Sequence, residues 1–339
     1  MDAGSWLRTH ANLRTEQERF ACLEGCGFCC TYPPQLDQAR WDAISQATGL
    51  KQVGLDPQGG LRLPLQGGCG GCALLEQRAC TAYELRPAHC RYFPFHVYFG
   101  RVVEVYADRV CPGLDPAPDL AGEQATVALP EALAQAFATA EVAELEAHME
   151  RAQQVHQAFE QNAREAGVWD DPEEARWDAL AHVAPGPQAW EEARVPFEAE
   201  EPERLPTMVL PRPSFPWRMW RIQGDEAEAL SFTETGELRT EHRVALPEPP
   251  GTLPDAVRTT LHRLVGLEGF VGAAFDLVDA SAYSLPVTAA VQKLVDQVAA
   301  SLLLRIPLLQ AEGLEPTAEA LAASYEPEFF DLPSIGGWL

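Results

Sequence analysis

All nine cysteines of this 339-residue chain lie in its first third, and none occurs after residue 111. They are Cys22, Cys26, Cys29, Cys30, Cys69, Cys72, Cys80, Cys90 and Cys111. A short segment with so many thiols is typically held together by a metal or by disulfide bonds, because it buries little apolar surface by itself. The remaining residues must then build a hydrophobic core of their own.

The spacing of the cysteines favours metal binding over disulfide bonds. Two residues separate Cys26 from Cys29, and two separate Cys69 from Cys72. Such pairs let two thiolates from one tight turn converge on a soft metal ion. The odd number of cysteines would leave one thiol over in any disulfide framework. Residues 1–20 lack the apolar core of a signal peptide, so we expect a cytoplasmic protein, in which thiols stay reduced.

The adjacent residues Cys29 and Cys30 indicate more than one metal centre. Side chains of neighbouring residues point in divergent directions, so two sites that take one thiolate each would use this pair more naturally than one site. Without Cys69, eight cysteines remain. They are enough for two centres of four thiolates each, or for one iron–sulfur cluster and one zinc ion.

The spacing of Cys22, Cys26 and Cys29, with Phe28 before the third cysteine, matches the loop by which radical-SAM enzymes hold a [4Fe–4S] cluster. Those enzymes have an apolar strand before the loop and repeated strand–helix units after it. Here charged residues precede the loop, and a stretch rich in proline and glycine follows it. A radical-SAM enzyme is therefore kept only as an alternative.

Two longer motifs contain most of these cysteines. The first is Phe20-Ala-Cys-Leu-Glu-Gly-Cys-Gly-Phe-Cys-Cys30. The second comprises Cys72-Ala-Leu-Leu, then Cys80-Thr-Ala-Tyr-Glu-Leu-Arg-Pro-Ala-His-Cys90-Arg-Tyr-Phe-Pro94, with Cys111-Pro-Gly113 downstream. Over residues 18–115 the chain resembles the CxxCxxCC family, also called YkgJ-like proteins, which are described as zinc- or iron-chelating. One departure is that three residues separate Cys22 from Cys26, where the family usually has two.

The resemblance implies that thiols of this segment bind a metal, and we favour an iron–sulfur cluster, [4Fe–4S] in composition, over zinc. His89 or His96 could replace a thiolate, because imidazole binds zinc and some iron–sulfur clusters. Cys69 lies outside the family motif and is interpreted as a spare thiol. Larger relatives include flagellin lysine methylases, so a protein methylase is a further alternative. The predicted metal ligands are Cys22, Cys26, Cys29, Cys30, Cys72, Cys80, Cys90 and Cys111.

Arginines accompany the second motif. From Arg78 to Cys111 the chain has five arginines and three acidic residues, a mildly basic stretch in an acidic protein. We predict that Arg86 and Arg91 are cofactor-binding residues that offset the charge of the thiolates or of the cluster. Ordinary salt bridges with neighbouring acids are the alternative interpretation of these arginines.

The pattern predicts an α+β fold, in which an irregular cysteine-rich metal-binding domain is followed by a mainly helical region with a small antiparallel sheet. Residues 96–106 predict a hairpin, and strand-like alternation over 217–246 predicts the sheet. Apolar periodicity predicts a long helix from about residue 130 to 166 and helices over 254–266, 286–305 and 316–325. The apolar residues 335–339 are expected to dock on the body or on a partner. The predicted divisions are 1–120 for the cysteine domain, 121–184 for a long helical segment, 185–216 for a proline-rich linker, and 217–339 for an α+β region of unassigned role.

The net charge of −25 argues against general nucleic-acid binding and against docking on an anionic membrane. The most apolar stretch, 295–309, is interrupted by Asp296, Arg305 and Pro307 and is too short for a membrane span. A protein partner, the oligomeric state and enzymatic activity stay open. The sequence thus predicts a metal-binding protein with a redox or accessory role. The alternatives are a cluster-dependent enzyme and a zinc-stapled interaction module without catalysis.

Overall fold

The computed structural model describes most of the chain, and Cys69 and Arg78 lie outside the described residues. The fold is α+β, as predicted: helices predominate, and the sheets are small. The described residues are 1–14, 18–23, 26, 28–31, 35–55, 60–66, 71–77, 79–115, 126–194, 207–209, 218–223, 225–232, 238–246, 252–330 and 332–338.

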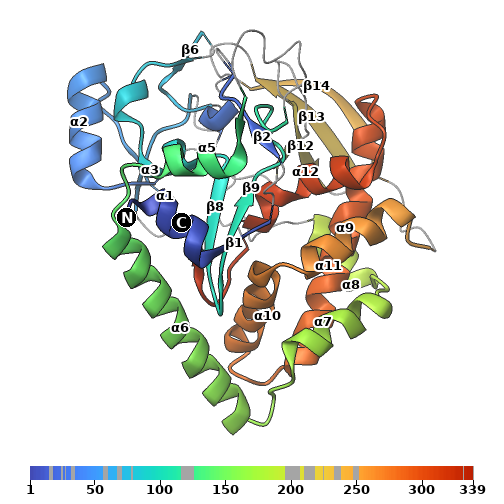
Figure 1. The fold of residues 1–339 in the computed structure, drawn as a ribbon. Helices are drawn as coiled ribbons and strands as arrows, with labels where there is room; N and C mark the ends of the chain where they lie inside the picture. The colour runs from blue at the N-terminus through green and yellow to red at the C-terminus, as the bar shows by residue number, and fades with distance from the viewer. Residues whose placement is uncertain are drawn as a thin grey trace.

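One sheet has four strands in the order β1-β9-β8-β15. Strands β1, β8 and β9 of this sheet lie near the middle of the molecule (Figure 1). Strands β8 (Phe95–Phe99) and β9 (Val103–Ala107) form the hairpin predicted over 96–106. Strand β1 (Ala11–Leu13) runs parallel to β9, and β15 (Gly337–Trp338) pairs antiparallel with β8. The C-terminal residues therefore dock on the body, and strands from both ends of the chain complete one sheet.

Four helices pack with the hairpin around one apolar core: α1 (Ala3–His10), α3 (Ala88–Tyr92), α5 (Leu129–Ala136) and α6 (Val142–Glu165). The prediction of one continuous helix from residue 130 to 166 is wrong, because the chain breaks between α5 and α6. The break places Phe137 in the core, fully buried, with its ring stacked on that of Tyr92 at 4.0 Å between centroids. Burial of this ring favours the break over a straight helix.

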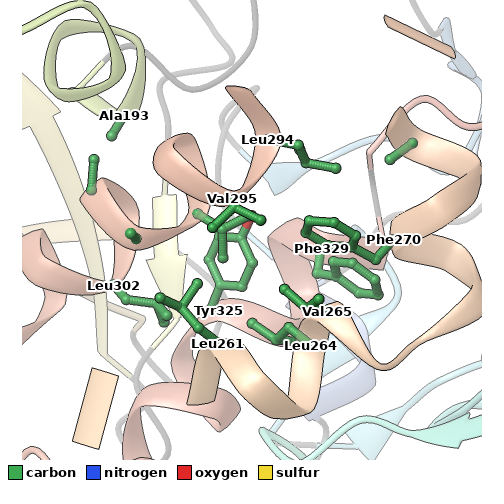
Figure 2. Close-up of a cluster of buried hydrophobic side chains, with 14 of the residues drawn as sticks. Ala193, Leu261, Leu264, Val265, Phe270, Leu294, Val295, Leu302, Tyr325 and Phe329 are labelled. Carbon is green, nitrogen blue, oxygen red and sulfur yellow. The ribbon is translucent and has the colours of Figure 1, made fainter. Parts of the chain in front are cut away.

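A second and larger core surrounds the helix α11. Leu294, Val295 and Leu302 of α11 lie in a cluster with side chains of the neighbouring helices (Figure 2). By length and composition α11 could cross a membrane, but 67% of its most apolar window is buried inside the protein, as in the core helix of a globular protein. The helices of this body are α7 (Pro172–Ala181), α8 (Pro187–Arg194), α9 (Asp255–Val265), α10 (Glu268–Ala280), α11 (Val287–Ala311) and α12 (Ala318–Phe330).

The predicted antiparallel sheet of the C-terminal region is confirmed, with the order β11-β12-β13-β14. Trp220 and Ala227 of this sheet are fully buried against the helical core. The proline-rich stretch 185–216 is only partly described, and its described part contains α8 and β11. The strands are β11 (Thr207–Val209), β12 (Arg218–Gln223), β13 (Glu226–Phe232) and β14 (Leu238–Ala245).

Short elements carry the cysteines, in agreement with the prediction of an irregular N-terminal part. They enclose a small core of their own, in which Ile44, Leu63 and Leu74 pack beside Cys30 and Cys72. The elements are β2 (Arg19–Phe20), the 3-10 turn η1 (Phe28–Thr31), β3 (Gln35–Leu36), α2 (Gln38–Thr48), β4 (Gly54–Leu55), β5 (Leu61–Arg62), β6 (Leu75–Glu76), β7 (Ala79–Cys80), the 3-10 turn η3 (Tyr83–Leu85) and β10 (Val127–Ala128).

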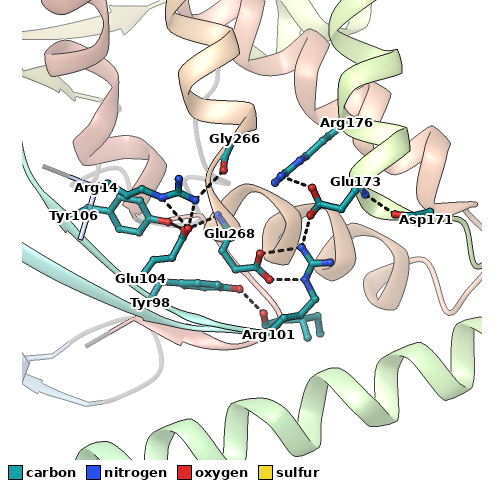
Figure 3. A network of polar contacts seen from close by, with 11 residues as sticks. Arg14, Tyr98, Arg101, Glu104, Tyr106, Asp171, Glu173, Arg176, Gly266 and Glu268 are labelled. Atoms are coloured by element: carbon teal, nitrogen blue, oxygen red, sulfur yellow. Dashed lines mark hydrogen bonds and ion pairs between the residues drawn. The ribbon is translucent and has the colours of Figure 1, made fainter. Parts of the chain in front are cut away.

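A network of polar contacts joins the hairpin to the helical body (Figure 3). Glu104 of β9 accepts hydrogen bonds from Arg14 and from the Tyr106 hydroxyl. It also accepts one from the backbone N–H of Glu268, at 2.7 Å, in the first turn of α10. Arg101, at the hairpin turn, makes a two-pronged pair with the Glu268 carboxylate, at 2.6 and 2.9 Å. These contacts line a cavity of about 350 Å³ and fix the hairpin against α10.

The docking of the C-terminal strand depends on the absence of a side chain at Gly272. The Gly272 carbonyl accepts from the N–H of Ile335 at 2.9 Å, and the Tyr98 hydroxyl donates to the Ile335 carbonyl at 2.5 Å. A Cβ atom at position 272 would overlap the Tyr98 hydroxyl. We expect Gly272→Ala to lower the free energy of unfolding by about 1–3 kcal/mol. Faster amide exchange in residues 335–338 should accompany the loss.

Urea unfolding measures the stability of Gly272→Ala, and hydrogen exchange measures the opening of its residues 335–338. Gly186→Ala is the matched control, because a Cβ there meets open space and the backbone is not left-handed. Equal stability and exchange for the two variants would contradict this account of the docked strand.

Candidate metal centre

Five thiols are brought together by a 3-10 turn, a small hairpin and a short helix. The turn η1 carries Cys29 and Cys30. The backbone N–H of Cys72 donates to the Cys30 carbonyl at 2.7 Å, and Cys80 ends strand β7 beside it. Helix α3 places Cys90 within electrostatic reach of these thiols. We call this set the Cys30 group: Cys29, Cys30, Cys72, Cys80 and Cys90.

Cys30 lies at the middle of its group, 7% exposed, and its thiol is hydrogen-bonded to those of Cys29 and Cys80. These bonds raise the pKa of Cys30 far above that of a free thiol, lower the pKa of Cys29, and lower the pKa of Cys80 to about 6. Burial raises the pKa of Cys72 to about 11 and also raises the pKa of Cys90. The group thus combines thiols that ionise readily with thiols that need a cation to ionise.

Three further thiols form a second set, the Cys111 group: Cys22, Cys26 and Cys111. The backbone joins two of its segments, since the N–H of Ala21 donates to the Gly113 carbonyl at 2.9 Å and Phe20 pairs with Leu114. Burial raises the pKa of the Cys111 thiol well above its usual range, and the nearby thiols of Cys26 and Cys22 raise it further. A glycine is needed at 113, because a Cβ there would overlap the Ala21 carbonyl.

Arg86 and Tyr83 lie between the two groups. The Arg86 guanidinium stacks on the Tyr83 ring, 3.5 Å from its centroid, and the Arg86 Nε donates to the Tyr83 carbonyl at 3.0 Å. Desolvation and the neighbouring Cys29 raise the pKa of Cys22, while Arg86 and a hydrogen bond from Tyr83 lower it. The Arg86 charge likewise acts to lower the pKa of Cys29 and Cys80. The charge of Arg86 therefore acts on thiols of both groups, and its cofactor-binding role stays a prediction.

Comparison with known families agrees with this arrangement. Residues 21–112 match the model of the CxxCxxCC family, whose description is "Putative zinc- or iron-chelating domain". This segment is a CxxCxxCC domain. The family predicted from the sequence is thereby confirmed, and the match supports a metal-binding role. No curated protein and no solved structure matches the chain.

The donor atoms of the CxxCxxCC domain fit zinc or iron. None of its eight described cysteines forms a disulfide, and thiolate sulfur is the preferred ligand of Zn²⁺ and of iron–sulfur clusters. The N–H of Leu74 points at the Cys72 sulfur from 3.5 Å, a kind of hydrogen bond that tunes sulfur-ligated metals. In the described part of the chain, no three His, Cys, Asp or Glu side chains are close enough to hold a single ion.

The other arginines of the CxxCxxCC domain have different surroundings. Arg101 is paired with Glu268, and Arg109 is paired with Glu18 and Glu326. Burial raises the pKa of Tyr92, and the charge of Arg91 opposes this rise. The buried Nε of Arg91 has no hydrogen-bond partner among the described residues. A cofactor-binding role of Arg91 stays a prediction.

Sequence reasoning missed two buried acids of the CxxCxxCC domain, Glu104 of the network described above and Asp108. Asp108 is 1% exposed, accepts from the N–H of Val110 at 3.0 Å, and lies 3.7 Å from the Nε2 atom of His96. Burial raises the pKa of Asp108 to about 7. Its position directly after the five buried residues of β9 is a signal that could have indicated its burial.

The two histidines of the domain lie on α3 and β8. The ring of His89 meets that of His96 edge to face, with 6.3 Å between centroids. The His96 ring also stacks on Phe330 of α12 at 4.1 Å, so part of its surroundings is aromatic core. Replacement of a thiolate by either imidazole stays a prediction.

Proposed function

We propose that the CxxCxxCC domain holds two neighbouring metal centres, of which one is a [4Fe–4S] cluster. The observation that carries this proposal is the position of Cys29, which is hydrogen-bonded to Cys30 and also acts on the pKa of Cys22. If Cys29 completes the Cys111 group, each group has four thiols, the number that a zinc site or a four-iron cube requires. The first centre then comprises Cys30, Cys72, Cys80 and Cys90, and the second comprises Cys22, Cys26, Cys29 and Cys111.

We assign the [4Fe–4S] cluster to the second centre, because the spacing of Cys22, Cys26 and Cys29 suits a cube. The first centre holds zinc or a second cluster. When bound, a [4Fe–4S] cluster supplies one-electron transfer. The chain contributes the thiolates, and the side chains of Ile44 and Leu63 shield Cys30 and Cys72 from water.

The role that we propose is that of an electron carrier or accessory metal protein, in a reducing compartment such as the cytoplasm, with a protein partner. The net charge of −25 supports this choice over a nucleic acid or an anionic membrane. A radical-SAM enzyme finds no support in the fold, since in the described part of the chain β1 and β9 are the one parallel pair of strands. No observation favours a protein methylase.

Elemental analysis of protein purified without oxygen tests the proposal, together with acid-labile sulfide and a visible spectrum. We expect about four iron and four sulfide per cluster and a brown protein. A colourless protein with one or two zinc ions would contradict the cluster and leave a zinc-stapled interaction module. Protein without any stoichiometric metal would contradict both centres.

A further inference from the structure

Tyr83 and Arg86 form a stacked pair at the accessible edge of the second centre. Cys22 is the one exposed cysteine among the described residues, and Tyr83 is 50% exposed. The Tyr83 hydroxyl is hydrogen-bonded to the Cys22 thiol, while its ring carries the Arg86 guanidinium at 3.5 Å. The backbone carbonyl of Tyr83 binds the Nε atom of the same arginine. Tyr83 therefore contacts both the Cys22 thiol and a cation that acts on that thiol.

The surroundings of Arg86 distinguish it from other arginines of this chain. Arg101, Arg109 and Arg263 each pair with a carboxylate that is almost completely buried. Arg86 forms no ion pair with any carboxylate that the structure describes. Its charge acts instead on the thiols of Cys22 and Cys29. The stacking on an aromatic ring explains what holds this guanidinium in place without a carboxylate.

We propose that Tyr83 is a positioning residue that holds Arg86 beside the cluster and thereby sets the reduction potential of the cluster. This inference rests on the proposed function. Reduction adds one electron to the cluster and transfers no atom. A nearby positive charge stabilises the more negative, reduced state, so it raises the potential, and a hydrogen bond to a ligating sulfur acts in the same direction.

Redox titration of the reconstituted protein, followed by the visible spectrum, tests the proposal. Arg86→Gln should shift the potential to a more negative value. Tyr83→Phe, which removes only the hydroxyl, should give a smaller shift of the same sign. Tyr83→Leu, which also removes the stacking surface, should give a larger shift than Tyr83→Phe.

A double-variant comparison distinguishes a positioning role from a merely structural one. If Tyr83 acts through Arg86, Tyr83→Leu and Tyr83→Phe should give the same potential in the Arg86→Gln background. Arg258→Gln, which removes an exposed charge on α9, is the control for the net charge and should leave the potential unchanged.

The outcomes separate this inference from the function on which it rests. A wild-type protein that binds no iron–sulfur cluster overturns both. If the wild-type protein binds a cluster, and the Arg86→Gln and Tyr83→Leu variants have the same reduction potential as wild type, the positioning role alone is overturned. Variants that lose the cluster are compared by the fraction of protein that still holds it. If Tyr83→Phe loses as much cluster as Tyr83→Leu, the positioning role is also overturned.

Discussion

Replacing Cys30 by serine is expected to remove the metal of the first centre and to lower the yield of soluble protein. Cys30 is buried, and its thiol contacts those of two other proposed ligands. A serine hydroxyl is a poor ligand for zinc or iron, and the binding free energy of a structural metal is also free energy of folding. In wild-type protein a strong chelator should lower the melting temperature. In Cys30→Ser the chelator should no longer have this effect at the first centre.

Two further variants test whether Cys30 is a metal ligand or only fills space in the core. Cys30→Ala keeps an apolar side chain in the small core, so it would bind metal normally if Cys30 only fills space. We expect it to lose the metal as Cys30→Ser does. Cys69→Ser is the control, because Cys69 lies outside the family motif, and it should keep the metal content of wild type. Unchanged metal content in both Cys30 variants would show that Cys30 is no ligand.

Glu104→Ala is expected to lower the free energy of unfolding by about 2–3 kcal/mol. The Glu104 carboxylate is 1% exposed, and burial raises its pKa in spite of the N–H of Glu268 and the charge of Arg14. Alanine would leave that N–H without its acceptor and would remove the hydrogen bond that the Tyr106 hydroxyl donates to Glu104 (Figure 3). The Arg14 side chain is 44% exposed and can turn to water, which keeps the loss below that of a fully buried ion pair.

Urea unfolding of the wild type, Glu104→Ala and Glu173→Gln measures this loss of free energy of unfolding. Glu173→Gln is the control, since the Glu173 carboxylate belongs to the same network but is 48% exposed. Its substitution should cost less than about 1 kcal/mol. A Glu104→Ala variant as stable as Glu173→Gln would mean that the network does not hold the hairpin on the helical body.

Local sequence patterns were sufficient for several parts of the fold. Alternation of apolar residues predicts the hairpin of β8 and β9 and the sheet of β12 to β14, and cysteine spacing together with the family motif identifies the metal-binding segment. Arg86 was predicted to bind the cofactor because it belongs to the same segment, and that role stays a prediction. Each of these features depends on residues that are close in the sequence, or on a motif that carries the geometry with it.

The features that were missed depend on distant contacts or lack a local signal. Helix α10 was not predicted, and it contains Gly269 and Gly272, a residue type that disfavours the helical conformation. The segment between α5 and α6 contains neither glycine nor proline, so no residue in it signals the end of a helix. The helix ends there because the Phe137 side chain is buried in the core. Whether an arginine faces a thiol or an acid depends on segments far along the chain, as the pairing of Arg101 with Glu268 shows.

The pairing of β15 with β8 has a consequence for the order of events during synthesis. The cysteine segment leaves the ribosome early, whereas Gly337 and Trp338 are made more than 200 residues later. Until then the edge of β8 that they cover is open, and an open edge can pair with other chains. A nascent chain can thus acquire its metal well before its central sheet is closed, so metal loading and protection against aggregation are separate steps in time.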